Sequence, residues 1–308
     1  PTITYASNLS NYFSTIPNEQ RISRDSKMYI FMVDGRTLHG GLSDRLRGAF
    51  SVYDYCKKKG YVFKILWTYP EKLQNYLVPA SVEWEITPEE MIYDRRIVDF
   101  KFFNSYSFMD NDEEAYAKLL DSNKSIVHVY SNVTIHEEKY EEYFQELFKM
   151  SSMLNRAFNE QLEAIGSNYI SISFRLIGLL GDFVDRPDLY PELENTEMKK
   201  EYIEACINAI KGLKEKNTDI ERILVTADSP IFLEEANKLD YVYVVPGGVV
   251  HIDQARGKKG VSLIKNYLDF LLIAKAIKSY YFVYGRMFAA TRFASTAALT
   301  GGKVIERL

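Results

Sequence analysis

The stretch KMYIFMVDGRTLHGGLSDRLRGAFSVYDYCKKKGYVFKILW, residues 27–67, decides the fold. Its first seven residues form an apolar run typical of a buried strand, and a second such run covers 61–67. Between them, apolar side chains recur at helical spacing: Leu42, Leu46, Ala49, Phe50 and Tyr53. Gly60 ends this helix after three lysines. A strand, a glycine-containing loop, a helix and a second strand predict the start of a parallel α/β sheet.

The same alternation extends over most of the chain. We expect further strands at 96–103, 125–131, 169–175, 222–227, 241–245 and 279–284, and helices near 111–121, within 136–165, and near 196–214, 229–238, 262–277 and 289–300. Strands that alternate with helices imply right-handed crossovers. The pattern therefore predicts an α/β protein with two Rossmann-like domains facing a cleft. Their boundary is expected between 150 and 167, which gives an N-terminal domain over 1–160 and a C-terminal domain over 161–308.

Composition narrows the class of protein. A length of 308 residues suits two domains, and a net charge of −4 argues against a nucleic-acid partner. The two cysteines, Cys56 and Cys206, form no CxxC pair and are expected as buried thiols in a reducing compartment. No apolar run approaches the roughly 20 residues that cross a bilayer, and the first residues lack a signal-peptide pattern. We therefore expect a cytoplasmic protein without a transmembrane segment.

In open parallel sheets, ligands bind outside the carboxyl ends of the strands. This rule selects four segments, namely 34–45, 175–182, 227–229 and 284–293. In the second of them, Ile170, Ile172 and Phe174 alternate with small polar residues, and Arg175 ends the strand. An arginine there can bind a phosphate through two nitrogens. The alternative is an ordinary salt bridge, for instance to Asp182.

The other segments carry weaker signals. Gly40 and Gly41 allow backbone N–H groups to approach a ligand, or they form a tight turn. Asp228 and Ser229 follow a strand, where an N-cap is also expected. Asp269 lies in an apolar helix and could accept the paired donors of a guanine edge. Thr291 and Arg292 could donate to a diphosphate. His251 and Asp253 could suggest a metal site, but they lack a third ligand.

Taken in order, these segments resemble the α1,2-, α1,6- and protein-O-fucosyltransferases, which have a two-Rossmann, GT-B-like fold. GGLSDRLRG resembles their Gly-Gly/Asn loop, and SISFRLIGLLGDF resembles their His-x-Arg-x-Gly-Asp motif. TADSPIFLEEA is similar to their Ser/Thr-Asp-Asp/Ser segment, and LDFLLIAKAIKSYYFV followed by TRFASTAA is similar to their closing helix, strand and Ser-x-Phe-Ser stretch. The resemblance covers most of residues 28–300.

The resemblance implies an inverting transfer of fucose from GDP-fucose to a glycan acceptor, without a required metal or cofactor. It implies that Arg175 binds the β-phosphate and that Asp182 matches the aspartate of the first motif, which makes both catalytic candidates. The nucleotide-sugar site would also include Asp228, Ser229, Asp269, Thr291, Arg292 and Phe293. Gly40, Gly41, Asp44 and Arg45 would face the transferred sugar or the acceptor, and Asp44 and Asp182 are candidate general bases.

Three departures from the family pattern leave alternatives open. Ser173 stands where the family has a histidine, Ala294 replaces a serine, and about four extra residues separate Arg175 from Asp182. The protein could use another nucleotide sugar, or it could be a non-catalytic protein with a decayed site. By analogy with the family, the product would be a surface polysaccharide or related glycan, with a possible peripheral association with membrane-bound glycan assembly.

Overall fold

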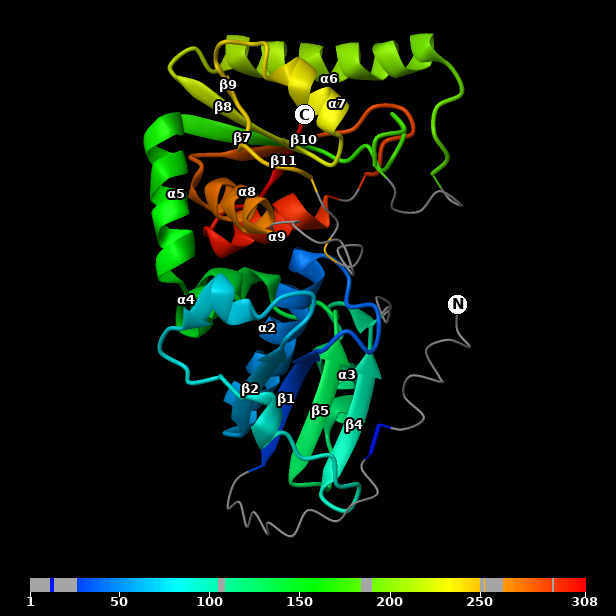
Figure 1. Cartoon of the computed structure of the whole chain (residues 1–308), viewed down its shortest axis with the longest axis vertical. Coiled ribbons are helices and arrows are strands. Elements are labelled where there is room, and N and C mark those ends of the chain that lie inside the picture. Colours follow the sequence, from blue (N-terminus) through cyan, green and yellow to red (C-terminus); the bar gives the residue numbers. More distant parts are fainter. Residues whose placement is uncertain are drawn as a thin grey trace. The chain divides into compact units, whose positions relative to one another are not determined.

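A computed structural model describes residues 12–13, 27–104, 109–183, 190–249, 252, 263–289 and 291–308 (Figure 1). The chain divides into two compact units, Pro1–Ser151 and Ser152–Leu308, each with its own parallel sheet. The predicted boundary after residue 160 falls inside α5 (Ser152–Ile165), the first helix of the second unit. The predicted α/β class with two parallel sheets is confirmed.

The sheet of the first unit has the strand order β2-β1-β5-β4, with all neighbours parallel. Its strands are β1 (Met28–Val33), β2 (Val62–Trp67), β4 (Val98–Phe103) and β5 (Ile126–Ser131). The helices α2 (Leu42–Lys59) and α3 (Glu113–Leu120) cover the face of β1 that carries Tyr29. The Tyr29 ring lies 5.3 Å from the Tyr55 ring of α2, and its hydroxyl donates to the Leu120 carbonyl of α3 at 3.1 Å.

Helix α2 lies unusually close to this sheet. A Cβ atom added at Gly48 would lie 1.8 Å from the Ser131 carbonyl oxygen at the end of β5. Only glycine therefore fits at this point of the helix. This close contact between Gly48 and Ser131 holds the first half of α2 at the carboxyl end of the sheet, and the β1–α2 loop is held there with it.

The opposite face of the first sheet is covered by irregular chain. Ile86, Met91 and Ile92 pack there against Met28, Ile30 and Met32 of β1. The shorter elements of this unit are 3-10 helices at Leu73–Asn75, Pro88–Glu90 and Glu137–Lys139, helix α4 (Tyr140–Leu147), and an antiparallel pair formed by β3 (Leu77–Pro79) and β6 (Phe148–Met150). The helices expected within 136–165 are thus α4 and α5, separated by β6.

The sheet of the second unit has the order β11-β10-β7-β8-β9, again with parallel neighbours. Its strands are β7 (Tyr169–Phe174), β8 (Arg222–Ala227), β9 (Val242–Tyr243), β10 (Ser279–Phe282) and β11 (Glu306–Arg307). Helices α6 (Thr196–Lys216) and α7 (Pro230–Ala236) cover one face, and α8 (Ile264–Lys275) and α9 (Arg292–Thr300) cover the other (Figure 1).

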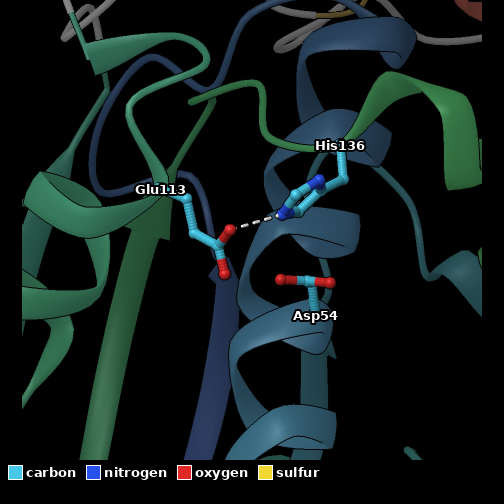
Figure 2. A group of neighbouring side chains, drawn as sticks. All are labelled: Asp54, Glu113 and His136. Atoms are coloured by element: carbon cyan, nitrogen blue, oxygen red, sulfur yellow. Dashed lines mark hydrogen bonds and ion pairs between the residues drawn. The ribbon is translucent and has the colours of Figure 1, made fainter.

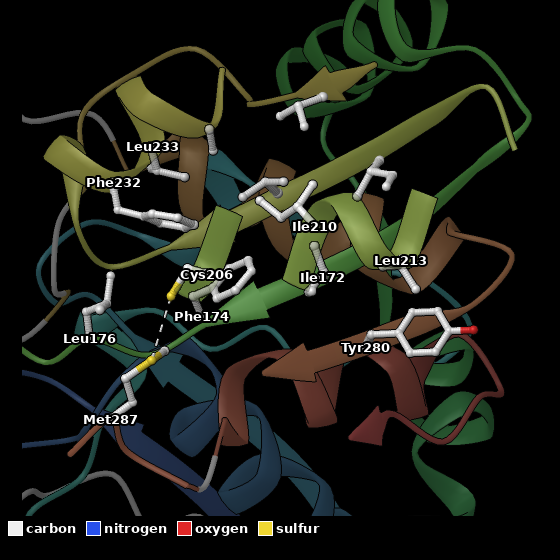
Figure 3. Close-up of a cluster of buried hydrophobic side chains, with 14 of the residues drawn as sticks. Ile172, Phe174, Leu176, Cys206, Ile210, Leu213, Phe232, Leu233, Tyr280 and Met287 are labelled. Carbon is white, nitrogen blue, oxygen red and sulfur yellow. Dashed lines mark hydrogen bonds between the residues drawn. The ribbon is translucent and has the colours of Figure 1, made fainter. Parts of the chain in front are cut away.

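The two faces of β7 have different partners. Ile172 and Phe174 pack into a core with Ile210 of α6 and Phe232 of α7 (Figure 3). Their small polar neighbours pair with hydroxyls on adjacent strands. Ser171 donates to Ser279 at 2.9 Å, and Ser173 is bonded to Thr226 at 2.7 Å. The α8 side of the sheet is therefore lined by small side chains.

The two cysteines, Cys56 and Cys206, are both buried and form no disulfide.

The strand order of the second sheet reverses at one point, between β7 and β10. Loops that leave neighbouring strands in opposite directions open a crevice at such a point, which is where ligands bind in open α/β sheets. The loop after β7 begins there. Within the described ranges, no helix is both long and apolar enough to span a membrane.

Candidate functional site

Arg175 directly follows β7, at the reversal point of the second sheet. Its Nη1 atom lies 3.4 Å from Oδ2 of Asp228, at the tip of the neighbouring strand β8, and its side chain is 28% exposed. The Arg175 carbonyl accepts a hydrogen bond of 3.1 Å from the Phe288 N–H, in the loop after β10. Three adjacent strand tips thus meet around this arginine, whose side chain remains partly accessible.

Asp228 faces the backbone of the Arg175 loop. Its Oδ1 accepts from the Leu176 N–H at 2.7 Å and its Oδ2 from the Ile177 N–H at 2.9 Å. The residue is only 6% exposed. Burial raises the pKa of its carboxyl, while Arg175 and the two N–H groups favour the carboxylate. The residue predicted to contact the nucleotide sugar therefore has both oxygens engaged by the loop that follows β7.

The residues between Arg175 and Asp182 form two successive turns. The Leu179 N–H donates to the Leu176 carbonyl at 3.0 Å, and the Gly181 N–H donates to the Gly178 carbonyl at 2.9 Å. Gly178 and Gly181 have φ of 89° and 84°, which suits glycine, but Ile177 has φ of 49°, which a β-branched residue rarely adopts. The loop leucines are 0–3% exposed and join the core of the unit. The extra residues relative to the family pattern are thus hydrophobic anchors.

Asp182 and Ser229 form one capping network. Oδ2 of Asp182 accepts from the Ser229 hydroxyl at 2.6 Å and from the Ile231 N–H at 2.8 Å. Oγ of Ser229 in turn accepts from the Phe232 N–H at 3.2 Å, as an N-cap does. Asp182 is therefore bound to the start of α7, and its Oδ1 is buried without a hydrogen-bond partner among the described residues.

Asp269 forms a buried ion pair with Lys265, one helical turn earlier in α8. Nζ of Lys265 lies 3.2 and 3.0 Å from the two carboxylate oxygens and donates to the Val245 carbonyl at 2.8 Å. The two side chains are 3% and 11% exposed. Burial raises the pKa of the Asp269 carboxyl, and Lys265 opposes that shift. Sequence reasoning missed Lys265, although its i,i+4 spacing to Asp269 was a usable signal.

Thr291, Arg292 and Phe293 mark the start of α9. Thr291 precedes the helix and is 9% exposed, whereas Arg292 is exposed at its first position. The Phe293 ring packs edge-on against Phe270 of α8 at 5.7 Å, so it serves the core between the two helices. The first backbone N–H groups of a helix attract anions, and Arg292 adds a positive charge at that end. Ala294 is 1% exposed and belongs to the core.

The β1–α2 loop of the first unit is held by its own polar groups. Gly40 has φ of 79°, and the Gly41 N–H donates to Oδ2 of Asp44 at 3.0 Å. Arg45 is fully buried, and its guanidinium donates to the Gly40 carbonyl at 3.0 Å and to the Tyr69 carbonyl at 2.6 Å. Asp44 caps α2 and remains partly exposed. Arg45, predicted to face the sugar or acceptor, is buried and holds the loop through these two carbonyls.

Two residues within the predicted segment 34–45 that were given no individual role have specific contacts. Asp34, which directly follows β1, accepts from the Tyr130 hydroxyl at 2.8 Å. His39 accepts from the Gly35 N–H at 3.0 Å through Nε2 and is only 4% exposed. Burial lowers the pKa of His39 to about 3, so its imidazole is neutral near pH 7. These contacts make the loop a pre-formed structure.

Asp54, Glu113 and His136 form the one group among the described residues whose ligand atoms are spaced for a metal ion (Figure 2). The ammonium of Lys58 already lies among them. Its Nζ is 2.7 Å from Oδ2 of Asp54 and 2.9 Å from Nε2 of His136, and it also donates to Glu113. A lysine therefore supplies the positive charge in this group, which is an ion-pair network linking α2 to α3.

The structure brings several predicted residues together and separates others. Arg175 meets Asp228, and Asp182 meets Ser229, all at the tips of β7 and β8. Asp269 and Phe293 lie on the neighbouring helices α8 and α9 and have separate contacts there. The glycine loop with Asp44 and Arg45 belongs to the other unit. His251 and Asp253 lie outside the described residues.

Comparison with known proteins gives structural relatives only. No protein-family model matches the sequence, and no curated protein matches it significantly. Among solved structures, the chain is similar to the α-1,6-fucosyltransferase NodZ soaked with GDP-fucose, with 14% identity, a TM-score of 0.52, and coverage of 90% of this chain and 93% of NodZ. NodZ from Bradyrhizobium gives 15% identity and a TM-score of 0.51, with coverage of 89% and 93%.

A mutant of FUT1 from Arabidopsis thaliana in complex with GDP is also similar. It has 11% identity and a TM-score of 0.56, and the match covers 98% of this chain and 73% of FUT1. At sequence identities this low, the structural match supports the architecture alone. The roles of single residues are therefore argued from the geometry of the site. The chain therefore has the two-sheet, GT-B-like fold of the fucosyltransferases.

Proposed function

We propose that this protein is a glycosyltransferase that moves fucose from GDP-fucose to a glycan acceptor with inversion at the anomeric carbon. The observation that carries the proposal is Arg175, a partly exposed arginine at the reversal point of the second sheet. The fold adds support, because structures of the similar enzymes were obtained with GDP or GDP-fucose. A pyrophosphate bound at this crevice would meet the arginine and the N-terminus of α9.

The proposed mechanism follows from where charge develops. As the bond between the sugar and the diphosphate breaks, negative charge grows on the departing GDP and positive charge on the sugar ring. Arg175 stabilises the departing diphosphate, assisted by Arg292 and by the N–H groups at the start of α9. Because these fixed donors supply the positive charge, we propose that no metal is required. Asp269 accepts the paired donors of guanine through the oxygen lone pairs that Lys265 leaves available.

The first unit contributes the acceptor side in this proposal. Asp44 is partly exposed at the start of α2 and is the candidate to accept the proton of the acceptor hydroxyl. Asp182 is the second candidate; one of its oxygens is bound at the start of α7 and the other is buried. The acceptor would be a surface glycan assembled at the cytoplasmic face of a membrane.

Nucleotide binding by Arg175→Ala tests the proposal. Titration calorimetry should detect GDP binding to the wild type and a loss of about tenfold or more in the variant. Turnover should fall on the order of 10²–10³-fold, by analogy with the removal of one oxyanion donor. Arg222→Ala is the matched control, because Arg222 begins β8 at the opposite end of the same sheet. Unchanged affinity and turnover in Arg175→Ala would disprove the assignment.

Two other functions are separated by the same assay. Binding of UDP or TDP in place of GDP would indicate a different nucleotide sugar and would remove the role given to Asp269. Binding of GDP without turnover of GDP-fucose would indicate a non-catalytic protein. The specific observation in favour of the latter is Ser173, which is buried and bonded to Thr226 where the family has a histidine.

A further inference from the structure

We propose that Asp228 and Asp182 are positioning residues: they form a reciprocal clasp that shapes the loop after β7 and fixes Arg175 before any nucleotide binds. Asp228, from the tip of β8, holds the beginning of the loop. Asp182, at the end of the loop, holds the beginning of the helix that follows β8. The inference rests on the proposed function only for the identity of the ligand, since the clasp is a property of the free protein.

The contacts of Asp228 reach the two residues that follow Arg175. Its two oxygens accept from consecutive backbone N–H groups, at 2.7 and 2.9 Å, and Oδ2 also lies 3.4 Å from the arginine. Consecutive N–H groups that point the same way form a concave anion-binding nest. A buried carboxylate held by such a nest and by a guanidinium has little freedom to move, so it defines the direction in which Arg175 leaves the strand.

The conformation of the loop needs such a support. Ile177 is in the left-handed region, with φ of 49°, and its N–H is one of the two that Asp228 accepts. A β-branched residue avoids this region, so it persists only where surrounding contacts over-determine it. Leu176 and Leu179, which flank it, are buried in the core and hold the loop from the other side. Strained backbone beside an accessible cation is the arrangement expected of a pre-organised binding loop.

Asp182 completes the clasp at the far end of the same loop. Its Oδ2 accepts from the Ser229 hydroxyl and the Ile231 N–H, so the loop end and the start of α7 are joined. Asp228 and Ser229 are adjacent in sequence, and therefore both ends of the loop are bound to one short segment. A group that is already ordered loses less conformational freedom when a ligand binds, which favours affinity.

Amide hydrogen exchange in the ligand-free protein tests the clasp directly. Asp228→Asn preserves the shape of the side chain but replaces the charge and one acceptor oxygen. We expect exchange at Leu176 and Ile177 to become at least tenfold faster, while the amides within β7 and β8 stay protected. Asp219→Asn, an exposed change before β8, is the matched control and should leave these rates unaltered. Unaltered rates in Asp228→Asn would overturn the proposal.

A double-mutant cycle tests whether Asp228 acts through Arg175. GDP affinity should fall in Asp228→Asn, and this effect should vanish when the change is made in an Arg175→Ala background. An equal loss in both backgrounds would mean that Asp228 contacts the nucleotide itself. A gain in affinity would mean that its carboxylate competes with the diphosphate. Either result would overturn the positioning role.

The two measurements also separate this inference from the proposed function. If the wild type binds no GDP, the proposed function fails, and hydrogen exchange alone then decides the clasp. If Asp228→Asn does not fold, Asp182→Asn takes its place. That variant should exchange faster at the Ile231 amide than the wild type, and an unchanged rate there would refute the reciprocal arrangement.

Discussion

Gly48 offers the sharpest test of how the first unit is packed. In Gly48→Ala the new Cβ would lie 1.8 Å from the Ser131 carbonyl oxygen and 3.0 Å from Cε2 of Phe31. Real Cβ contacts essentially never fall below 3.0 Å, so α2 and β5 would have to separate by about 1.2 Å at this point. Overpacking costs about 1–3 kcal/mol, and the upper end applies because the obstacle is backbone. Alanine returns about 1 kcal/mol of helix propensity, which leaves a net loss of about 2 kcal/mol or more.

Gly212→Ala is the matched control, because Gly212 lies inside α6 and a Cβ there would meet nothing within 4 Å. This variant should gain about 0.5–1 kcal/mol from helix propensity alone. Urea unfolding measures both changes. The two tryptophans, Trp67 and Trp84, lie in the first unit, so fluorescence reports Gly48→Ala and far-UV circular dichroism reports Gly212→Ala. Equal effects of the two substitutions would refute the close approach of α2 to β5.

Three further predictions concern ionisable side chains. Burial lowers the pKa of His39 and His128 to about 3, whereas the pKa of a histidine in the unfolded chain is about 6.5. Below pH 6.5 the unfolded chain therefore binds protons that the folded protein does not. The unfolding free energy of the first unit should fall there by up to about 1.4 kcal/mol per pH unit for each histidine. His128→Phe should remove one proton from that slope in urea titrations at pH 4–7; an unchanged slope would contradict the assignment. Lys58→Met should remove the ammonium from the centre of the Asp54, Glu113 and His136 group. Zn²⁺ should then raise the thermal unfolding midpoint of the variant and not that of the wild type. An equal response of both proteins would show that the lysine does not block the ion. Lys265→Met should lower the free energy of unfolding by about 3–5 kcal/mol, because it leaves Asp269 buried without its cation. Adding Asp269→Asn should restore part of this loss. Urea unfolding followed by circular dichroism measures both changes, and an unchanged stability of Lys265→Met or no recovery in the double variant would contradict the expectation.

The main elements were predictable because their side chains repeat with a clear period. The strands β1, β7 and β8, and helices α2 and α6, lie within a few residues of their expected limits. The strands β3, β6 and β11 were not predicted, because each has only two or three residues and shows no clear alternation. Their pairing is decided by tertiary contacts.

The candidate site was predictable in position but less so in contacts. The strand-tip rule selected Arg175, Asp228 and Asp182 correctly as neighbours of the β7 and β8 tips. It could not reveal that Arg45 is buried, because its partners are the carbonyls of Gly40 and Tyr69, and backbone carbonyls are present at every position.

The paired hydroxyls along β7 bear on which substitutions this strand tolerates. Ser173 and Thr226 are both buried, and they satisfy each other across the strands. A larger side chain at 173 would add volume to a layer that is already filled. An apolar residue there would also leave the Thr226 hydroxyl without this partner. The two positions are therefore coupled, and a change at one is tolerated best together with a matching change at the other.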